Sequence, residues 1–217
     1  MVTKLLILGK GDNIITMILD NLYSHYTRQP DIHIYNNLNL PILNTFEHDR
    51  FNIQVFDKVI IDDYELMVLG VYNPIHKIRI VKSLNPDLNK FMNLIHDGLD
   101  ISYTSKLGRG VTINSKVSIA AHTTIGDMVT INRHVSIGHH TTIGDYCSIN
   151  PGTNIAGNVT MGKGTTIGMG TNIINGVKIG DNTIIGAGSV VTKDIPNNVV
   201  AYGNPCKIVR ENETQSI

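Results

Sequence analysis

The stretch that decides the fold is residues 113–149, which read INSKVSIAAHTTIGDMVTINRHVSIGHHTTIGDYCSI. An isoleucine stands at every sixth position of this stretch, and the step of six continues without a slip from residue 101 to residue 191. The positions are all aliphatic: Ile101, Leu107, Ile113, Ile119, Ile125, Ile131, Ile137, Ile143, Ile149, Ile155, Met161, Ile167, Ile173, Ile179, Ile185 and Val191. A helix repeats every 3.6 residues and a strand every two. A period of six therefore indicates a repeat architecture.

This period predicts a β-solenoid, in which each hexad forms one short strand and one corner. Three hexads make a triangular coil of 18 residues, and coils stack at the strand spacing of about 4.8 Å. The stretch from 101 to 191 is long enough for five such coils. The periodic aliphatic side chains fill the prism layer upon layer. Cys147 stands at a second inward position of its hexad, so we expect it in the core.

The first half of the chain predicts a small α/β unit. Strands are expected at residues 4–8, 31–35, 58–61 and 65–70, and a loop at 37–57. One helix face is indicated by the spacing of Ile15, Ile18, Leu19 and Leu22. A second helix is expected to start at Asn73 and Pro74, a cap and a first-turn proline, with its inner face at Ile75, Ile78 and Val81. Alternating strands and helices favour a short parallel sheet.

Composition and charge exclude several classes of protein. The 217 residues carry 18 basic and 18 acidic side chains, so no net field attracts nucleic acid or an acidic membrane. Hydrophobic residues make up 41%, which excludes a disordered chain. Two cysteines are too few for a disulfide scaffold. No segment has the length of a membrane span or a signal peptide, so we expect a cytoplasmic protein without membrane insertion.

Residues one coil apart are expected to lie one above the other on the same edge of the prism. His139 then lies about 4.8 Å from the backbone of Gly157, which has no side chain in the way. A base and a backbone N–H for a developing oxyanion are what transfer from a thioester to an amine requires. The geometry alone slightly favours a second interpretation, in which His139 only decorates an outer corner. His122 and His140 are also one coil apart and are expected to stack as solvated edge residues.

Five segments together carry a family resemblance. They read SIGHHTTIGDY at 136–146, NLIH at 93–96, AGNV at 156–159, IGAGSVV at 185–191 and AYGNPCK at 201–207. The chain resembles bacterial sugar acetyltransferases, among them sialic-acid O-acetyltransferases and nucleotide-sugar 4-amino N-acetyltransferases. The resemblance implies a Rossmann-like α/β domain at 1–97, a left-handed parallel β-helix at 98–195, and a tail at 196–217 that contributes to the coenzyme A site.

The resemblance also implies site residues for the donor. His139 matches the general base, Asn132 an active-site asparagine, and Gly157 the amide that meets the acetyl carbonyl. Ser148 falls where the family often has a second histidine in contact with acetyl-CoA. The family has a carboxylate after the catalytic histidine, whereas this chain has His140, which we include among the catalytic residues and which cannot supply the same charge. Further acetyl-CoA contacts are implied at Gly168, Gly186, Ala187, Pro205 and Lys207.

Nucleotide-sugar contacts are implied in the first half. The Gly-rich turn after the first strand would hold the diphosphate with Gly9, Lys10, Gly11, Asp12 and Asn13. Asn36 and Asn37 stand where the family has an acidic pair, and Gly70 matches the glycine that ends the next strand of the site. Because a lone G-x-G is a weak signal, the donor half of the site is the better supported.

These observations predict an acetyl-CoA-dependent enzyme that N-acetylates a nucleotide-linked amino-deoxy sugar in bacterial surface-glycan biosynthesis. It is expected to be a homotrimer that uses no metal and binds no nucleic acid. The alternatives are a sugar O-acetyltransferase, a zinc enzyme like the γ-class carbonic anhydrases, and a non-catalytic scaffold. The zinc hypothesis rests on the spacing of His134 and His139, but Gly98 stands where a third histidine would be needed.

Overall fold

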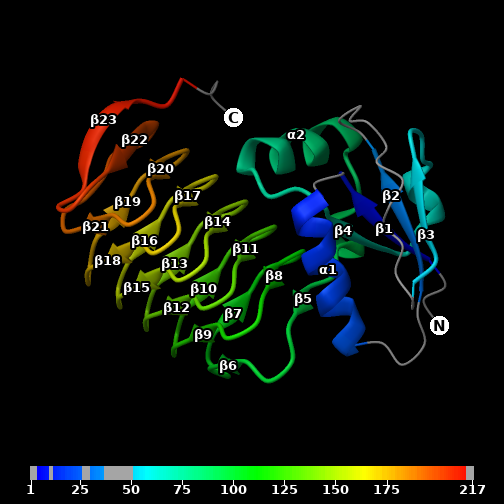
Figure 1. Ribbon diagram of the computed structural model, residues 1–217, viewed down its shortest axis with the longest axis horizontal. Coiled ribbons are helices and arrows are strands. Elements are labelled where there is room, and N and C mark those ends of the chain that lie inside the picture. The colour runs from blue at the N-terminus through cyan, green and yellow to red at the C-terminus, as the bar shows by residue number, and fades with distance from the viewer. Residues whose placement is uncertain (1–3, 10–11, 26–29, 37–50, 214–217) are drawn as a thin grey trace.

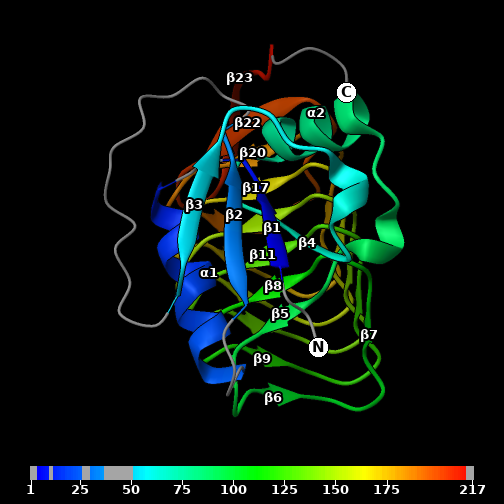
Figure 2. The same ribbon diagram turned by 90° about the vertical axis from the view of Figure 1, so that its right-hand side faces the viewer.

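The computed structural model describes residues 4–9, 12–25, 30–36 and 51–213. A small α/β unit packs against one end and one side of a long stack of coils, and a two-stranded hairpin closes the far end of the stack (Figure 1). Figure 2 shows the sheet of the α/β unit in front of the coils, with α1 on one side and α2 above. The predicted fold class, an α/β domain followed by a parallel β-helix, is confirmed.

The N-terminal sheet has four parallel strands in the order β3-β2-β1-β4. Their bounds are β1 (Lys4–Leu8), β2 (Asp31–Tyr35), β3 (Ile53–Phe56) and β4 (Leu66–Leu69). The predicted strand at 58–61 is wrong, because the third strand lies at Ile53–Phe56, inside the stretch expected to be a loop. The pairing of β3 with β2 ends where the Asn36 N–H donates to the Phe56 carbonyl. Part of the predicted strand instead forms the 3₁₀ helix η1 (Ile61–Asp63).

Two helices cover the two faces of this sheet. Helix α1 (Asp12–His25) buries the predicted face, Ile15, Ile18, Leu19 and Leu22, against β1, β2 and β4. Helix α2 (Pro74–Leu84) begins as expected, with the Asn73 side chain accepting from the Ile75 N–H at 2.9 Å. Its most buried inner residues are Lys77, Ile78 and Ile80, while the predicted Ile75 and Val81 are half-buried. Lysine on this inner face was not expected.

The β-helix is built from short strands that pair with the equivalent strands of the coils below and above, as the period predicts. Thr130 pairs with Thr112 below and with Ser148 above, and the other coils repeat this register. The three faces of the prism are parallel sheets. Their strands are β5 (Leu94–Ile95), β6 (Asp100–Ile101), β7 (Lys106–Leu107), β8 (Thr112–Ile113), β9 (Ser118–Ile119), β10 (Thr124–Ile125), β11 (Thr130–Ile131), β12 (Ser136–Ile137), β13 (Thr142–Ile143), β14 (Ser148–Ile149), β15 (Asn154–Ile155), β16 (Thr160–Met161), β17 (Thr166–Ile167), β18 (Asn172–Ile173), β19 (Lys178–Ile179), β20 (Ile184–Ile185) and β21 (Val190–Val191).

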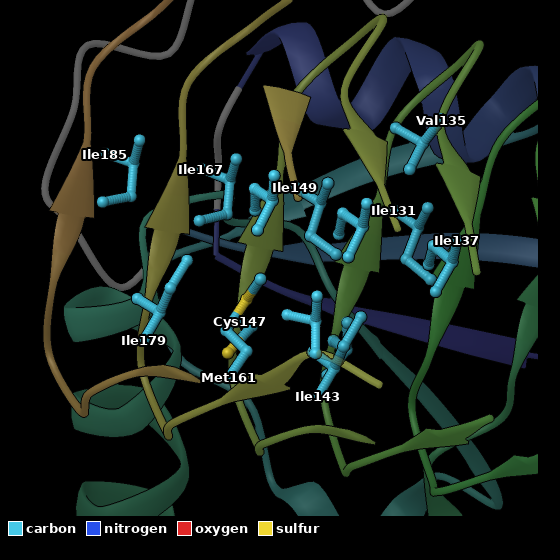
Figure 3. Close-up of a cluster of buried hydrophobic side chains, with 14 of the residues drawn as sticks. Ile131, Val135, Ile137, Ile143, Cys147, Ile149, Met161, Ile167, Ile179 and Ile185 are labelled. Atoms are coloured by element: carbon cyan, nitrogen blue, oxygen red, sulfur yellow. The ribbon is translucent and has the colours of Figure 1, made fainter. Parts of the chain in front are cut away.

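The interior of the prism is a column of stacked aliphatic side chains (Figure 3). Ile131, Ile149, Ile167 and Ile185 come from successive coils and are all buried. Buried threonines satisfy the corner carbonyls, as where Thr141 Oγ1 donates to the Ala156 carbonyl at 3.1 Å. Cys147 occupies an equivalent inward place, as predicted, and its thiol lies 3.0 Å from the Gly162 carbonyl.

The regular period ends at the top of the prism. Strand β22 (Val199–Tyr202) pairs with β20 through Ile184 and Val200, which are closer in sequence than one full coil requires. It then forms an antiparallel hairpin with β23 (Lys207–Glu211). The predicted tail therefore extends one face of the prism. In the part of the chain that the structure describes, no helix has the length and apolar character needed to cross a membrane.

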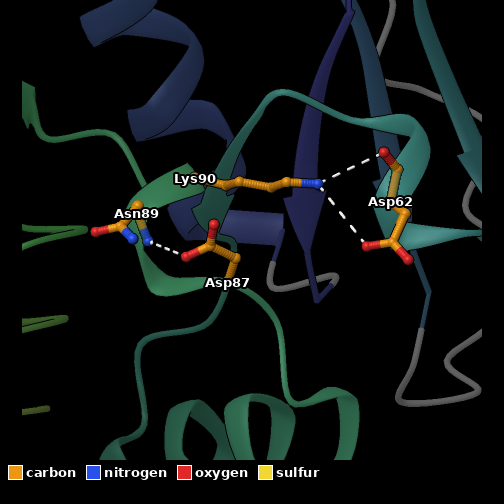
Figure 4. A network of polar contacts seen from close by, with 4 residues as sticks. All are labelled: Asp62, Asp87, Asn89 and Lys90. Atoms are coloured by element: carbon orange, nitrogen blue, oxygen red, sulfur yellow. Dashed lines mark hydrogen bonds and ion pairs between the residues drawn. The ribbon is translucent and has the colours of Figure 1, made fainter.

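The connection between α2 and the first coil contains the 3₁₀ helix η2 (Leu88–Lys90), which is capped by the Asp87 carboxylate (Figure 4). Lys90 reaches back to Asp62, with its Nζ 3.9 Å from the carboxylate and 3.5 Å from the main-chain carbonyl. Because the Asp62 side chain is almost fully exposed, this ion pair contributes little to stability.

Candidate functional site

Two edges of the prism carry the candidate site residues. We name the edge formed by residues 120–122, 138–140 and 156–158 the histidine corner. The edge formed by residues 96–98, 114–116, 132–134, 150–152, 168–170 and 186–188 is the asparagine corner. Each set repeats once per coil, because equivalent strands of successive coils pair directly. His139 lies on the first edge and Asn132 on the second, so one chain does not bring these two predicted residues together.

At the histidine corner, the imidazole of His139 lies directly over Gly157. A Cβ atom on Gly157 would stand 2.8 Å from His139 Nε2 and 2.7 Å from Cε1, so any other residue at 157 would force the ring out of this position. The sequence spacing predicted this contact. The His139 side chain is exposed, whereas Gly157 is buried beneath it. The arrangement presents a solvent-accessible imidazole beside a backbone without a side chain.

The N–H of Gly157 has no hydrogen-bond acceptor among the residues that the structure describes. In the coil below, Gly138 leaves this N–H uncovered, because a Cβ atom on residue 138 would come within 2.5 Å of the Gly157 nitrogen. A free amide next to an imidazole is the pair of groups that can stabilise an oxyanion and accept a proton.

His140 contacts His139 from the adjoining position of the same turn. Their Nδ1 atoms are 3.1 Å apart, and their rings meet edge to face at 85°. His140 adopts a left-handed backbone conformation with φ of 56°. The predicted stacking of His122 and His140 is confirmed, with ring centroids 4.8 Å apart.

At the asparagine corner, a pocket of about 680 Å³ opens between α1 and the coils. It lies beside three stacked asparagines, Asn114, Asn132 and Asn150. The other lining residues are Ile14, Thr16, Met17, Asp20, Asn21, Tyr72, His96, Ser115 and Arg133. The lining combines amide, hydroxyl and apolar side chains with the ionisable Asp20, His96 and Arg133, so it offers many hydrogen-bond donors and acceptors to a polyhydroxylated group.

Asn132 is part of a relay of amides that joins α1 to the coils. Asn21 on α1 donates to Asn114 at 3.3 Å, and the Asn114 amide in turn donates to Asn132 Oδ1 at 3.2 Å. The Asn132 side chain also hydrogen-bonds to the phenol of Tyr72, whose hydroxyl donates to the Ile149 carbonyl at 3.0 Å. Burial raises the pKa of Tyr72 to about 12, so the phenol stays protonated and can donate. These bonds hold Asn132 in a fixed orientation in the pocket wall.

Ser148 lies inside the protein, at the contact between α2 and the coils. Its side chain is fully buried and donates to the Tyr72 carbonyl at 2.5 Å. It also accepts a hydrogen bond from Lys77 Nζ at 3.1 Å. The proposed contact of Ser148 with acetyl-CoA would therefore require these bonds to open.

Lys77 is a feature that sequence reasoning missed. Its ammonium group is fully buried, and its three N–H groups are shared among four acceptors: Thr130 Oγ1 at 2.8 Å, the carbonyls of Met128 and Cys147 at 3.0 and 3.1 Å, and Ser148 Oγ at 3.1 Å. Burial away from water lowers the pKa of Lys77 to about 7. The sequence spacing could have predicted its burial, because Lys77 lies three residues after Pro74 and four before Val81, on the apolar face of α2.

The residues expected to bind the nucleotide sugar meet at the carboxyl ends of β1, β2 and β4. Gly9 and Gly70 are in contact there, since a Cβ on Gly70 would lie 2.5 Å from the Gly9 carbonyl oxygen. Asn36 is buried at the end of β2, with its amide 3.4 Å from the Asp57 carboxylate. Asp12 and Asn13 begin α1. Three further predicted residues, Lys10, Gly11 and Asn37, lie outside the described residues.

The residues expected to bind acetyl-CoA lie at the upper asparagine corner and the end of the prism. Gly168 must lack a side chain, because a Cβ there would come within 2.4 Å of the Ala187 nitrogen. Gly186 is half-buried and Ala187 is exposed, as are Pro205 in the turn between β22 and β23 and Lys207 at the start of β23.

Metal ligands do not gather in the part of the chain that the structure describes, which contains no group of three or more His, Cys, Asp or Glu side chains able to hold an ion. His134, one of the two histidines behind the zinc hypothesis, lies on the asparagine corner, whereas His139 lies on the histidine corner. Within one chain they therefore belong to different edges.

Several solved structures share this architecture along nearly the whole chain. Perosamine N-acetyltransferase from Caulobacter crescentus, in complex with CoA and GDP-perosamine, is 24% identical with a TM-score of 0.82, over 96% of this chain and 97% of that one. The acetyltransferase domain of PglB from Neisseria gonorrhoeae, in complex with acetyl coenzyme A, is 20% identical with a TM-score of 0.80, over 96% and 100%. WeeI from Acinetobacter baumannii is 18% identical with a TM-score of 0.76, over 95% and 100%.

At the sequence level, residues 122–157 and 158–193 match the bacterial transferase hexapeptide (six repeats) family. No curated protein matches the chain. The matched segments contain all three histidines of the histidine corner and Gly157. Residues 122–193 therefore resemble the bacterial transferase hexapeptide family, and nearly the whole chain shares the fold of the three structures above.

Proposed function

We propose that this protein is an acetyl-CoA-dependent acetyltransferase that N-acetylates the amine of a nucleotide-linked amino-deoxy sugar, as a step in bacterial surface-glycan biosynthesis. The observation that carries the proposal is the pairing of an exposed His139 imidazole with the unpaired N–H of buried Gly157. The shared fold supports the choice of class, because similar structures hold CoA with GDP-perosamine or acetyl coenzyme A.

In the proposed reaction the acceptor amine attacks the thioester carbonyl directly. The new C–N bond forms, the C–S bond breaks, and His139 Nε2 takes the amine proton and returns it to the sulfur of CoA. The Gly157 N–H donates to the carbonyl oxygen while that oxygen carries negative charge. Asn132 and the pocket beside α1 would hold the sugar.

A covalent acetyl-enzyme is disfavoured by the positions of the nucleophiles. Cys147 is fully buried, and burial raises the pKa of its thiol to about 12, so thiolate is scarce at neutral pH. Ser148 is buried and already hydrogen-bonded to Tyr72 and Lys77. Neither side chain can reach a donor at the surface without local opening.

The proposal is tested by incubating the purified protein with acetyl-CoA and a panel of UDP-, dTDP- and GDP-linked amino sugars. We expect CoA release and a monoacetylated product with at least one acceptor, with the acetyl group on nitrogen by NMR. Acetyl on a hydroxyl would select the O-acetyltransferase alternative. Activity that a chelator abolishes would select the zinc enzyme, and no transfer to any acceptor would favour the scaffold.

We further propose a homotrimer, because a single chain leaves the site incomplete. His139 and the pocket lie on different corners, and cyclic packing of three prisms would bring the histidine corner of one subunit to the asparagine corner of the next. Sedimentation equilibrium is expected to give three times the chain mass of 23.9 kDa. Mixed trimers of His139→Ala with a pocket-blocked Ser115→Trp chain should regain activity. A monomeric mass would contradict this assembly.

A further inference from the structure

Three histidine rings form a connected group at the histidine corner. The ring of His122, one coil below, packs on His140 with centroids 4.8 Å apart and planes at 41°. His140 in turn meets His139 through their Nδ1 atoms, which are 3.1 Å apart. None of the three rings forms an ion pair within the described residues. The Nδ1 contact therefore joins two imidazoles without help from a carboxylate.

The contact between the two Nδ1 atoms constrains where the protons sit. A hydrogen bond needs one N–H and one lone pair, so only one of the two Nδ1 atoms carries a proton. If His139 is to accept a proton at Nε2, its own proton must be on Nδ1. His140 must then offer a lone pair at Nδ1 and carry its proton on Nε2.

We propose that His140 is the positioning residue for His139, accepting the Nδ1–H of His139 and so fixing the tautomer whose Nε2 is free to act as base. His122 supports this arrangement by packing against the His140 ring from the coil below. This inference rests on the proposed function, because it assigns a second group to the same site. It gives a neutral imidazole the orienting task that a carboxylate or carbonyl commonly performs.

The pH dependence is the distinguishing consequence. A proton on His139 removes the base, and a proton on His140 places an N–H where the acceptor must be. The groups that face His140 are His139 in its own turn and His122 below, with Asn158 at the equivalent place above, which does not titrate. A proton on either ring therefore switches the site off, so the acid limb of log(kcat/KM) should be steeper in the wild type than in a variant whose residue 140 cannot take a proton, measured with the same acceptor.

The test compares two substitutions of His140 that suit its left-handed backbone. Asparagine tolerates φ of 56°, as Asn158 does with the same φ one coil above, and its side-chain oxygen can accept the Nδ1–H without titrating. Glycine also tolerates this φ but supplies no acceptor. We expect His140→Asn to keep kcat within about threefold at high pH and to make the acid limb less steep than in the wild type with the same acceptor.

We expect His140→Gly to lower kcat by about 10–100-fold, the usual effect of losing an orienting partner, while KM for acetyl-CoA stays nearly unchanged. His122→Asn is the matched control, because it removes the third titrating ring and keeps the acceptor. Its acid limb should stay steep. A steep limb that persists in His140→Asn, or that disappears in His122→Asn, would overturn the proposal, as would wild-type kcat in His140→Gly.

A second measurement separates this inference from the proposed function. ¹⁵N spectra of histidine-labelled protein without substrates should show His139 protonated at Nδ1 and His140 at Nε2. If these tautomers are found but no acceptor is acetylated, the histidine pair stands and the proposed reaction fails. The reverse tautomers, or rapid averaging between the two forms, would overturn the pair even if acetyl transfer is observed.

Discussion

Replacing His139 by alanine is expected to lower kcat by about 10²–10⁴-fold, the contribution typical of a general base. The dissociation constant for acetyl-CoA should change little, because the proposed donor contacts come mainly from backbone at Gly157, Gly168 and Ala187. The measurement is a steady-state assay of CoA release together with calorimetric titration of acetyl-CoA. The two readouts separate loss of the base from loss of binding.

The matched control for His139→Ala is His76→Ala. His76 is a half-buried histidine on α2 and does not line the pocket, so this variant should keep wild-type kcat. Wild-type turnover in His139→Ala would refute the assigned role. A fall in acetyl-CoA affinity as large as the fall in kcat would instead make His139 a binding residue.

The β-helix was predictable because its signal is local and repeated. Each hexad supplies its own inward aliphatic residue, so a misinterpreted position is corrected by the pattern of the neighbouring hexads. The contact of His139 with Gly157 follows from the same arithmetic, since the two residues are one coil apart. The strand Ile53–Phe56 had no such support. It is four residues long and was hidden in a stretch without clear periodicity.

The contact between the α/β unit and the coils was not predictable, for a different reason. Spacing predicted a helix after Asn73 and a coil around Asn132, but not which of their surfaces meet. The structure shows that Asn132 hydrogen-bonds to Tyr72 and that Lys77 enters the coils. The Nδ1 contact between His139 and His140 depends on side-chain rotamers, which sequence spacing does not determine.

Lys77 should make the stability of the protein rise with pH between about 7 and 9. The pKa of Lys77 is about 7 in the folded protein, against 10.5 for a lysine in water, so in this range the unfolded chain binds a proton that the folded chain does not. Stability then increases with pH, by up to about 1.4 kcal/mol per unit. Below pH 7 both states are protonated, and the cost of burying the ammonium is constant. Above about pH 9 the Cys147 thiol opposes the trend, because it ionises only in the unfolded chain.

The variant Lys77→Met isolates this effect, since methionine keeps an apolar stem of similar length but cannot titrate. Urea unfolding at fixed protein concentration and at pH 7, 8 and 9 should show a wild-type gain of up to about 3 kcal/mol, which Lys77→Met lacks. The control is Lys82→Met, which replaces an exposed lysine in the last turn of the same helix and should keep the wild-type dependence on pH.

At pH 9, Lys77→Met should be less stable than wild type, because the Met128 carbonyl and the Thr130 hydroxyl lose the amine that donates to them. If the free energy of unfolding depends on pH equally in wild type and Lys77→Met, the Lys77 ammonium keeps its proton inside the fold. The assignment of a neutral Lys77 above pH 7 would then be wrong.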